Sequence, residues 1–248
     1  MMKQILLALI INGVGIAYGE NTKFHQANQY YKEGKYEQAI SLYQQIIDSG
    51  IKNGVIFYNL GNAYLKNGQL GKSILSYERA KRFLPRDEDI NSNLAYANLL
   101  TIDKISKKRH WLKAGIIKAH QLLNINEQTL VIFIIYLIIT LLIILYIFIN
   151  KRLFIITGII LVSVFLILLI SLSLKIHSTL QQKEVIMIVP RVEVKSGAED
   201  KIETIFFIHE GTKVKINEVR DNWYCIELLD GKIGWIKNDT VERIYSTY

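Results

Sequence analysis

The 248-residue sequence predicts a multidomain membrane protein with an all-α array of helical repeats, a two-helix transmembrane hairpin and an all-β barrel. Two uncharged apolar runs, residues 129–149 and 153–174, predict the hairpin. A pattern with a period of 34 residues precedes them and predicts the repeats. Short alternating apolar runs follow them, separated by turns that contain glycine, and predict the barrel.

Each apolar run has about the twenty residues that a helix needs to cross a hydrocarbon layer of roughly 30 Å. Lipid offers no hydrogen-bond partner, so only a segment that satisfies its own amides can cross it. We predict transmembrane helices at residues 128–150 and 153–174, with Lys151 and Arg152 at the membrane interface between them. The alternative is a pair of helices buried in a soluble core, but such helices are rarely apolar on every side over this length.

The first 19 residues have the features of a secretory signal peptide. Lys3 supplies a positive charge, a short apolar core follows, and Ala17-Tyr18-Gly19 places small residues before a cleavage point. The alternative is an uncleaved anchor helix. Either interpretation places the segment that follows outside the cytoplasm.

Residues 20–103 are predicted to be helical and repetitive, with the clearest unit at 54–87. Small Gly61 and Ala80 allow two antiparallel helices to approach closely, while Gly68 permits a tight turn and Pro85 ends the unit. This spacing resembles the tetratricopeptide repeat. A looser copy lies at 20–53, and the segment from residue 88 starts a third unit that we interpret as a capping helix.

The resemblance implies a concave face, lined by the first helix of each repeat, that binds protein partners. The family's groove positions that we select as partner-binding candidates are Asn28, Tyr31, Tyr58, Asn59, Asn62, Leu65 and Lys66. Some family members clamp a peptide carboxylate there, but Phe24, Asp89 and Asn93 stand where that clamp needs basic residues. Carboxylate capture is therefore disfavoured. The alternative is that this face only packs helices and contacts solvent.

Residues 104–127 carry six of the basic residues against one acidic residue, together with Trp111. Apolar side chains recur there at helical spacing, which favours an amphipathic helix at the membrane interface with Trp111 at headgroup depth. A solvated linker is the alternative. Because the net charge of +8 is concentrated beside the membrane, it indicates anionic headgroups rather than nucleic acid as its partner.

Residues 184–248 contain six β-type runs, and Asp230-Gly231 between two of them is a hairpin signal. The segment resembles a bacterial SH3-like domain. The motifs that carry the resemblance are Val194-Lys195-Ser196-Gly197, Glu210-Gly211-Thr212, Asn222-Trp223-Tyr224 and Gly231-Lys232-Ile233-Gly234-Trp235. The resemblance implies a binding groove lined by Trp223 and Tyr224, with Trp223 the more exposed ring and Trp235 in the core.

Motifs for chemistry are absent from the sequence. There is no nucleophile elbow, phosphate-binding glycine loop or paired acidic motif, and the five histidines show no metal-ligand spacing. Cys225 is the only cysteine, which excludes an intramolecular disulfide and a thiolate metal cluster. No ionisable residue lies inside either apolar run, so an ion pathway is disfavoured. We predict neither an enzyme nor a transporter, with no cofactor and no metal.

The order of the parts resembles the BatE proteins of the Bacteroides aerotolerance group. This resemblance implies a membrane scaffold that acts with von Willebrand A-type Bat membrane proteins and is linked to oxygen or stress tolerance. The alternative is a cell-envelope sensor or binding module whose SH3-like domain holds peptidoglycan peptides. A regulator that signals through the hairpin is disfavoured, because so few residues connect the two spans.

The predicted location is the bacterial inner membrane, with two spans and both soluble domains in the periplasm. The signal peptide exports the repeats, and Lys151 and Arg152 then turn the chain in the cytoplasm, as the positive-inside rule prefers. The basic segment at 104–127 would lie outside, against that rule. We give precedence to the signal peptide, because export has already begun when that segment emerges.

Overall fold

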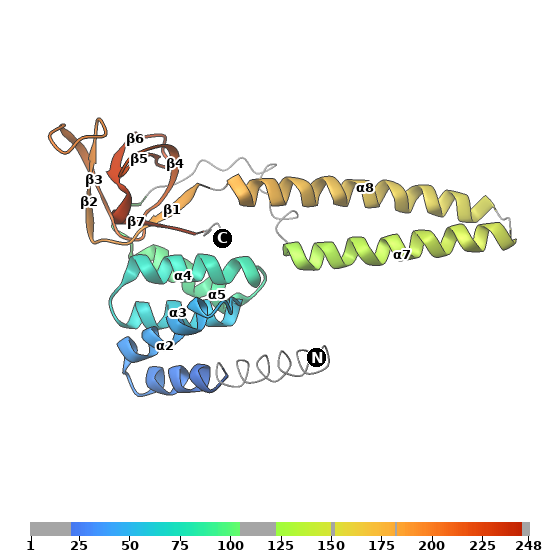
Figure 1. The fold of residues 1–248 in the computed structure, drawn as a ribbon, viewed down its shortest axis with the longest axis horizontal. Coiled ribbons are helices and arrows are strands. Elements are labelled where there is room, and N and C mark those ends of the chain that lie inside the picture. Colours follow the sequence, from blue (N-terminus) through green and yellow to red (C-terminus); the bar gives the residue numbers. More distant parts are fainter. Residues whose placement is uncertain (1–20, 105–122, 150–151, 182, 245–248) are drawn as a thin grey trace, which may run out of the picture. The chain divides into compact units, whose positions relative to one another are not determined.

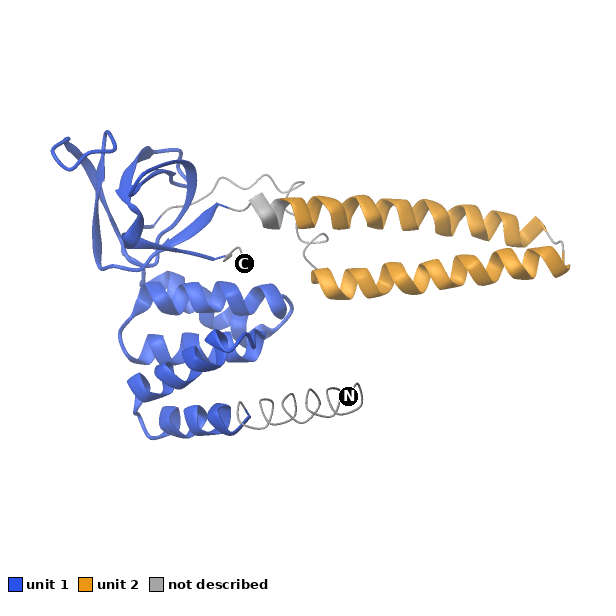
Figure 2. Ribbon diagram, in the orientation of Figure 1, with its two compact units in different colours: residues 1–107, 183–246 blue, residues 108–182, 247–248 orange. Residues whose placement is uncertain are grey.

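The computed structural model describes residues 21–104, 123–149, 152–181 and 183–244. The chain divides into two compact units (Figure 2). One contains residues 1–107 and 183–246, and the other contains residues 108–182 with the last two residues. The predicted fold class is confirmed: helical repeats, two long apolar helices and a small β domain are all present (Figure 1). The predicted signal peptide, Trp111 and Lys151 lie outside the described residues.

Five helices make up the repeat array. Residues 21–32 form the first, and α2 (Tyr36–Asp48), α3 (Gly54–Lys66), α4 (Leu70–Phe83) and α5 (Glu88–Leu100) follow. The side chain of Asn53 caps α3 by accepting the Ile56 N–H, and Asp87 caps α5 in the same way through Ile90. Helix α5 starts the third unit, and no second helix follows it within the described residues up to 104.

The predicted packing of the repeats is present. Tyr43 and Ile46 of α2 are buried against Ile56 and Leu60 of α3 in the core of the first unit. Gly68 has a φ of 76°, the left-handed conformation that a glycine adopts without steric cost in the turn between α3 and α4. The sequence pattern therefore identified both the helix pairs and the turn that joins them.

The β domain is a seven-stranded antiparallel sheet. Its strands are β1 (Glu184–Met187), β2 (Arg191–Lys195), β3 (Thr204–His209), β4 (Lys213–Arg220), β5 (Trp223–Glu227), β6 (Ile233–Lys237) and β7 (Val241–Arg243). They are ordered β3-β2-β6-β5-β4-β1-β7, so β3 and β7 form the two edges. The predicted closed barrel is therefore wrong as to hydrogen bonding: the sheet is open, because a short seventh strand pairs with β1 instead of closing on β3.

The array and the β domain share a hydrophobic core within the first unit. Ile74 and Leu75 of α4 and Leu94 of α5 pack in one buried cluster with Ile186 of β1 and Ile244, which follows β7. Helix α5 begins a third repeat, and the surface that it forms with α4 is where the second helix of that repeat would pack. The β domain covers this surface instead.

Polar contacts border this shared core. Arg79 of α4 donates to the Glu242 carboxylate at 2.8 Å and to the Arg243 carbonyl at 2.7 Å. Lys213 of β4 lies 3.3 Å from Glu78 and 3.0 Å from Glu184. Burial lowers the pKa of Lys213, but the two carboxylates outweigh that effect and raise the pKa above its ordinary value. The second repeat helix is thus joined to the sheet by charged groups that have their partners.

Two glycines allow the backbones of α4 and the β domain to approach each other. A Cβ added at Gly71 would lie 2.3 Å from the Met187 carbonyl oxygen, and one added at Gly211 would lie 2.7 Å from a side-chain carbon of Ile74. The Gly71 N–H also donates to the Glu210 carboxylate at 3.0 Å. Any larger residue at either position would push the sheet away from the helix.

The second unit is the apolar hairpin, α7 (Ile125–Ile149) and α8 (Arg152–Gln181). Both helices are long and apolar enough to cross a membrane, and almost none of their apolar windows is buried. The soluble-core alternative requires buried helices and therefore does not describe this unit. Arg152 starts α8, and the segment predicted as a stalk after residue 174 continues the same helix.

A polar clasp joins the two helices of the hairpin at the ends remote from the turn. Gln128 of α7 is buried and donates to the Leu168 carbonyl of α8 at 3.1 Å. Lys175 of α8 donates to the Gln128 side-chain oxygen at 3.0 Å and to the Leu123 carbonyl at 2.7 Å. Such hydrogen bonds fix the register of two helices whose other facing residues are apolar.

Candidate partner-binding site

Equivalent positions of the first helices form rows across the array. A shift of 34 residues relates Asn28 to Asn62, Tyr31 to Leu65, and Lys32 to Lys66. Lys32 and Lys66 are exposed, and the other four side chains are half-buried. A third shift reaches α5 at Tyr96, Leu99 and Leu100, all exposed. The rows are thus polar or aromatic in the first two units and apolar in the third.

The same hydrogen-bonded triad occurs twice, one repeat apart. Tyr43 donates its hydroxyl to the Asn28 side-chain oxygen at 2.6 Å, and Asn59 donates its amide to the same oxygen at 3.0 Å. In the next unit, Asn62 accepts from Tyr77 at 2.6 Å and from Asn93 at 3.0 Å. Each triad links one first helix to its own second helix and to the next first helix, so it fixes the spacing of the face.

The triads leave polar groups available on this face. The oxygens of Asn28 and Asn62 each accept two hydrogen bonds, and within the described residues neither side-chain amide nitrogen donates one. Burial raises the pKa of Tyr43 to about 12 and also raises the pKa of Tyr77, so both hydroxyls remain protonated donors near neutral pH. Two amide donors at repeat spacing suit the carbonyl groups of a peptide backbone.

The predicted groove residues lie together, on two neighbouring helices. Asn28 and Tyr31 come from the first helix, and the remaining five come from α3. Tyr58 accepts a hydrogen bond from Asn93 of α5 at 3.1 Å, so the side chain that stands at a clamp position takes part in the amide network. Tyr43 and Tyr77 were missed as members of this network. Their signal was the equal spacing of Asn28–Tyr43 and Asn62–Tyr77.

The aromatic groove predicted on the β domain is not exposed. Trp223 and Trp235 are each only 9% exposed, so the expectation that Trp223 is the freer ring is wrong. Lys237 lies over the Trp223 ring and Arg220 over the Trp235 ring, while Tyr224 packs against the sheet core. These aromatic side chains cover apolar surface between charged strand residues, and their role in binding stays a prediction.

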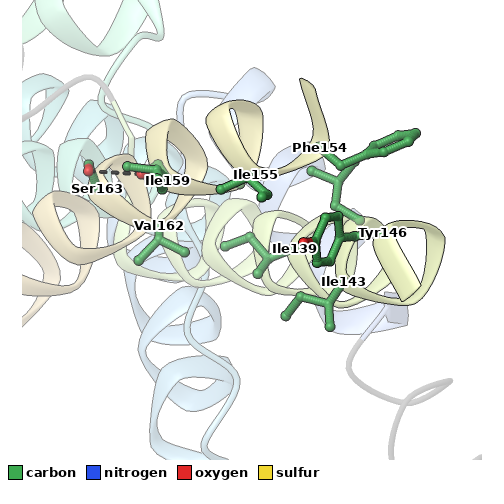
Figure 3. A pocket seen from close by; sticks show the side chains of 10 residues that line it. Ile139, Ile143, Tyr146, Phe154, Ile155, Ile159, Val162 and Ser163 are labelled. Atoms are coloured by element: carbon green, nitrogen blue, oxygen red, sulfur yellow. Dashed lines mark hydrogen bonds between the residues drawn. The ribbon is translucent and has the colours of Figure 1, made fainter. Parts of the chain in front are cut away.

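A cavity of about 350 Å³ lies between α7 and α8 inside the hairpin unit (Figure 3). Its lining is almost wholly apolar and includes Ile139, Tyr146, Phe154 and Gly158. The Ser163 hydroxyl donates to the Ile159 carbonyl of its own helix at 2.9 Å. This lining offers shape to an acyl chain or apolar side chain but no group for acid–base chemistry.

Clusters of metal-ligating side chains are not found among the described residues: no three His, Cys, Asp or Glu side chains lie close enough to share an ion. The prediction that the chain needs no metal or cofactor therefore stays a prediction.

Comparison with known families identifies one repeat. A tetratricopeptide repeat model matches residues 24–50, which is the unit with the looser sequence pattern. No curated protein is found to be similar to the chain. Tetratricopeptide repeats generally mediate protein–protein interactions, so the array is a protein-binding element by its family.

Proposed function

We propose that the chain is a non-enzymatic, membrane-anchored scaffold that binds a segment of a protein partner along the first helices of its array. The repeated Asn–Tyr–Asn triad carries this proposal, because it holds Asn28 and Asn62 with their amide donors on one face. Peptide carbonyl oxygens are the partner groups that such donors would bind, and Lys32 and Lys66 would favour an acidic segment beside them.

The resemblance to BatE proteins supplies the finer proposal. It places the scaffold in a Bat-type complex, with von Willebrand A-type membrane proteins as partners and oxygen or stress tolerance as the process. The alternative of a peptidoglycan-binding SH3-like domain depended on an exposed Trp223. Because that ring is covered by Lys237, we favour the array as the binding element.

Charge reversal on the groove face tests the scaffold. The double change Lys32→Glu and Lys66→Glu should abolish co-purification of the von Willebrand A-type membrane proteins with the full chain in mild detergent. Both lysines are exposed, so folding should be retained. The matched control is Lys201→Glu with Lys215→Glu, two exposed positions on the β domain. Equal recovery of these partners with the groove variant and the control would contradict the proposal.

A fusion at the C-terminus tests the proposed topology. Alkaline phosphatase joined after Tyr248 should be active, because we place the β domain in the periplasm. A cytoplasmic reporter at the same position should be inactive. The opposite pair of results would reverse the orientation and leave the groove test unaffected.

A further inference from the structure

Exposed apolar side chains gather at the end of α5. Leu99 is 73% and Ile102 67% exposed, and Tyr96 and Leu100 are also exposed. We name these four residues the α5 ridge. The opposite face of α5 is buried through Ile90, Leu94 and Ala97, so the helix is apolar on both sides. An isolated exposed leucine is ordinary, whereas four large apolar side chains within seven residues form a surface.

The structure holds Ile102 in its exposed position. Thr101 before it is buried and donates its hydroxyl to the Asn98 carbonyl at 2.8 Å. Asp103 after it accepts the His209 N–H at 2.7 Å and the Thr212 hydroxyl at 2.6 Å. Because the residues on both sides are fixed, Ile102 cannot turn inward without breaking these contacts.

The ridge is specific to the third unit and extends beyond the groove. The 34-residue shift that relates Lys32 to Lys66 reaches Leu100, so a lysine position has become apolar. The same shift relates Gly34 and Gly68 to Ile102. Those glycines occupy turns rather than the groove face. A peptide in the groove would therefore leave Ile102 uncovered, and a different occupant is needed.

The sequence that follows the ridge identifies that occupant. Residues 104–127 carry six basic residues against one acidic residue, and the chain enters the apolar helix α7 at Ile125. Large apolar side chains beside lysine and arginine are typical of segments that bind anionic membrane surfaces. We propose that the α5 ridge inserts among the headgroups of an anionic membrane, and that the adjacent basic residues bind lipid phosphates.

Site-directed fluorescence on the full chain tests the insertion. In a Cys225→Ser background, Ile102→Cys is labelled with an environment-sensitive dye, and the chain is placed at one copy per nanodisc. Val55→Cys, an equally apolar position on α3 that is 49% exposed, is the matched control. Lipids that carry a spin label near the headgroup should quench the dye at position 102 and leave the dye at 55 unchanged. Zwitterionic lipid in place of anionic lipid should weaken the quenching at position 102.

Three results would overturn the inference. Equal lipid quenching at both positions, or full access of aqueous iodide to the dye at position 102, would show that the ridge lies in water. Protection at position 102 that arises only with two copies per nanodisc would assign the ridge to contact between chains. Quenching that is the same in anionic and zwitterionic lipid would remove the headgroup part of the proposal. The groove test above is independent of all three.

Discussion

Asp103 shows how one residue connects distant parts of the chain. Its carboxylate accepts hydrogen bonds from His209 and Thr212, which lie more than a hundred residues away in the β domain. Burial raises the pKa of this carboxyl, but the hydrogen bonds from Thr212 and His209 outweigh it and leave the pKa below its ordinary value. A charged acceptor that binds two donors stabilises the junction more than a neutral one would.

We therefore expect the junction to weaken in acid through Asp103. A carboxyl whose pKa is depressed by folding contributes stability above its unfolded pKa of about 3.9, and that contribution is lost as the pH falls through the folded value. Asp103→Asn should lower stability near neutral pH by about 1–3 kcal/mol and should reduce the further loss below pH ~4. Amide exchange of residues 204–209 in the full chain, followed against pH, measures both effects.

The exposed Asp48 at the end of α2 supplies the control. Asp48→Asn should leave exchange of β3 unchanged at every pH, because no hydrogen bond joins it to the β domain within the described residues. If the Asp103→Asn chain and the native chain lost protection in parallel on acidification, another group would be responsible for the acid sensitivity.

At this scale the sequence predicted side chains that follow the repeat and failed for those that depend on distant contacts. Asn28 and Asn62 could be placed by register, because equivalent positions of a repeat face the same way. Trp223 could not, because its burial depends on Lys237 from the next strand. The partners of Asp103 were equally invisible, since nothing local joins residue 103 to residues 209 and 212.

Helix α4 illustrates the element scale, because it differs from its equivalent α2 on the outer face. The 34-residue shift relates Glu37 to Gly71 and Ser41 to Leu75. Glu37 and Ser41 are exposed, whereas Gly71 and Leu75 are buried. Comparison of the two repeats therefore marks the helix that supports another domain, a signal present in the sequence although we had not used it.

Gly71→Ala should destabilise the first unit despite the better helix propensity of alanine. Propensity favours alanine by about 1 kcal/mol. The new Cβ, however, would meet the Met187 carbonyl oxygen at 2.3 Å, and overpacking of this kind costs about 1–3 kcal/mol. Glu37→Ala, at the equivalent exposed position, should change stability by less than about 0.5 kcal/mol. Thermal unfolding of both full-length variants decides, and a stabilised Gly71→Ala chain would contradict the close approach.

Element boundaries followed from the sequence where the pattern was long and failed where it was short. The helix pairs and the apolar spans were predicted because their periodicities extend over many residues. Strand β7 has only three residues, Val241–Arg243, and was missed. Its pairing with β1 opens the sheet that the family resemblance had suggested to be a barrel.

The whole molecule differs most from its prediction in the number of independent parts. The sequence suggested two separate binding modules held together by the hairpin. The structure instead places the array and the β domain in one compact unit, because Leu75, Leu94, Ile186 and Ile244 share a core. Each of these is an ordinary apolar residue, and a sequence alone does not show which of them meet. A short array of this kind needs a cap, and the β domain provides it.

Removal of residues 184–248 should therefore expose α4 and α5 and destabilise the array. In the full chain, Leu75→Ser should lower the stability of the array by about 2–5 kcal/mol, because it empties a buried site. In the truncated chain the same change should cost little, since Leu75 would already face solvent, and serine is the residue at the equivalent position 41. Limited proteolysis of residues 21–104 in the four membrane-reconstituted chains measures this difference. An equal cost in both backgrounds would mean that the array buries Leu75 by itself, and that the two domains are independent modules after all.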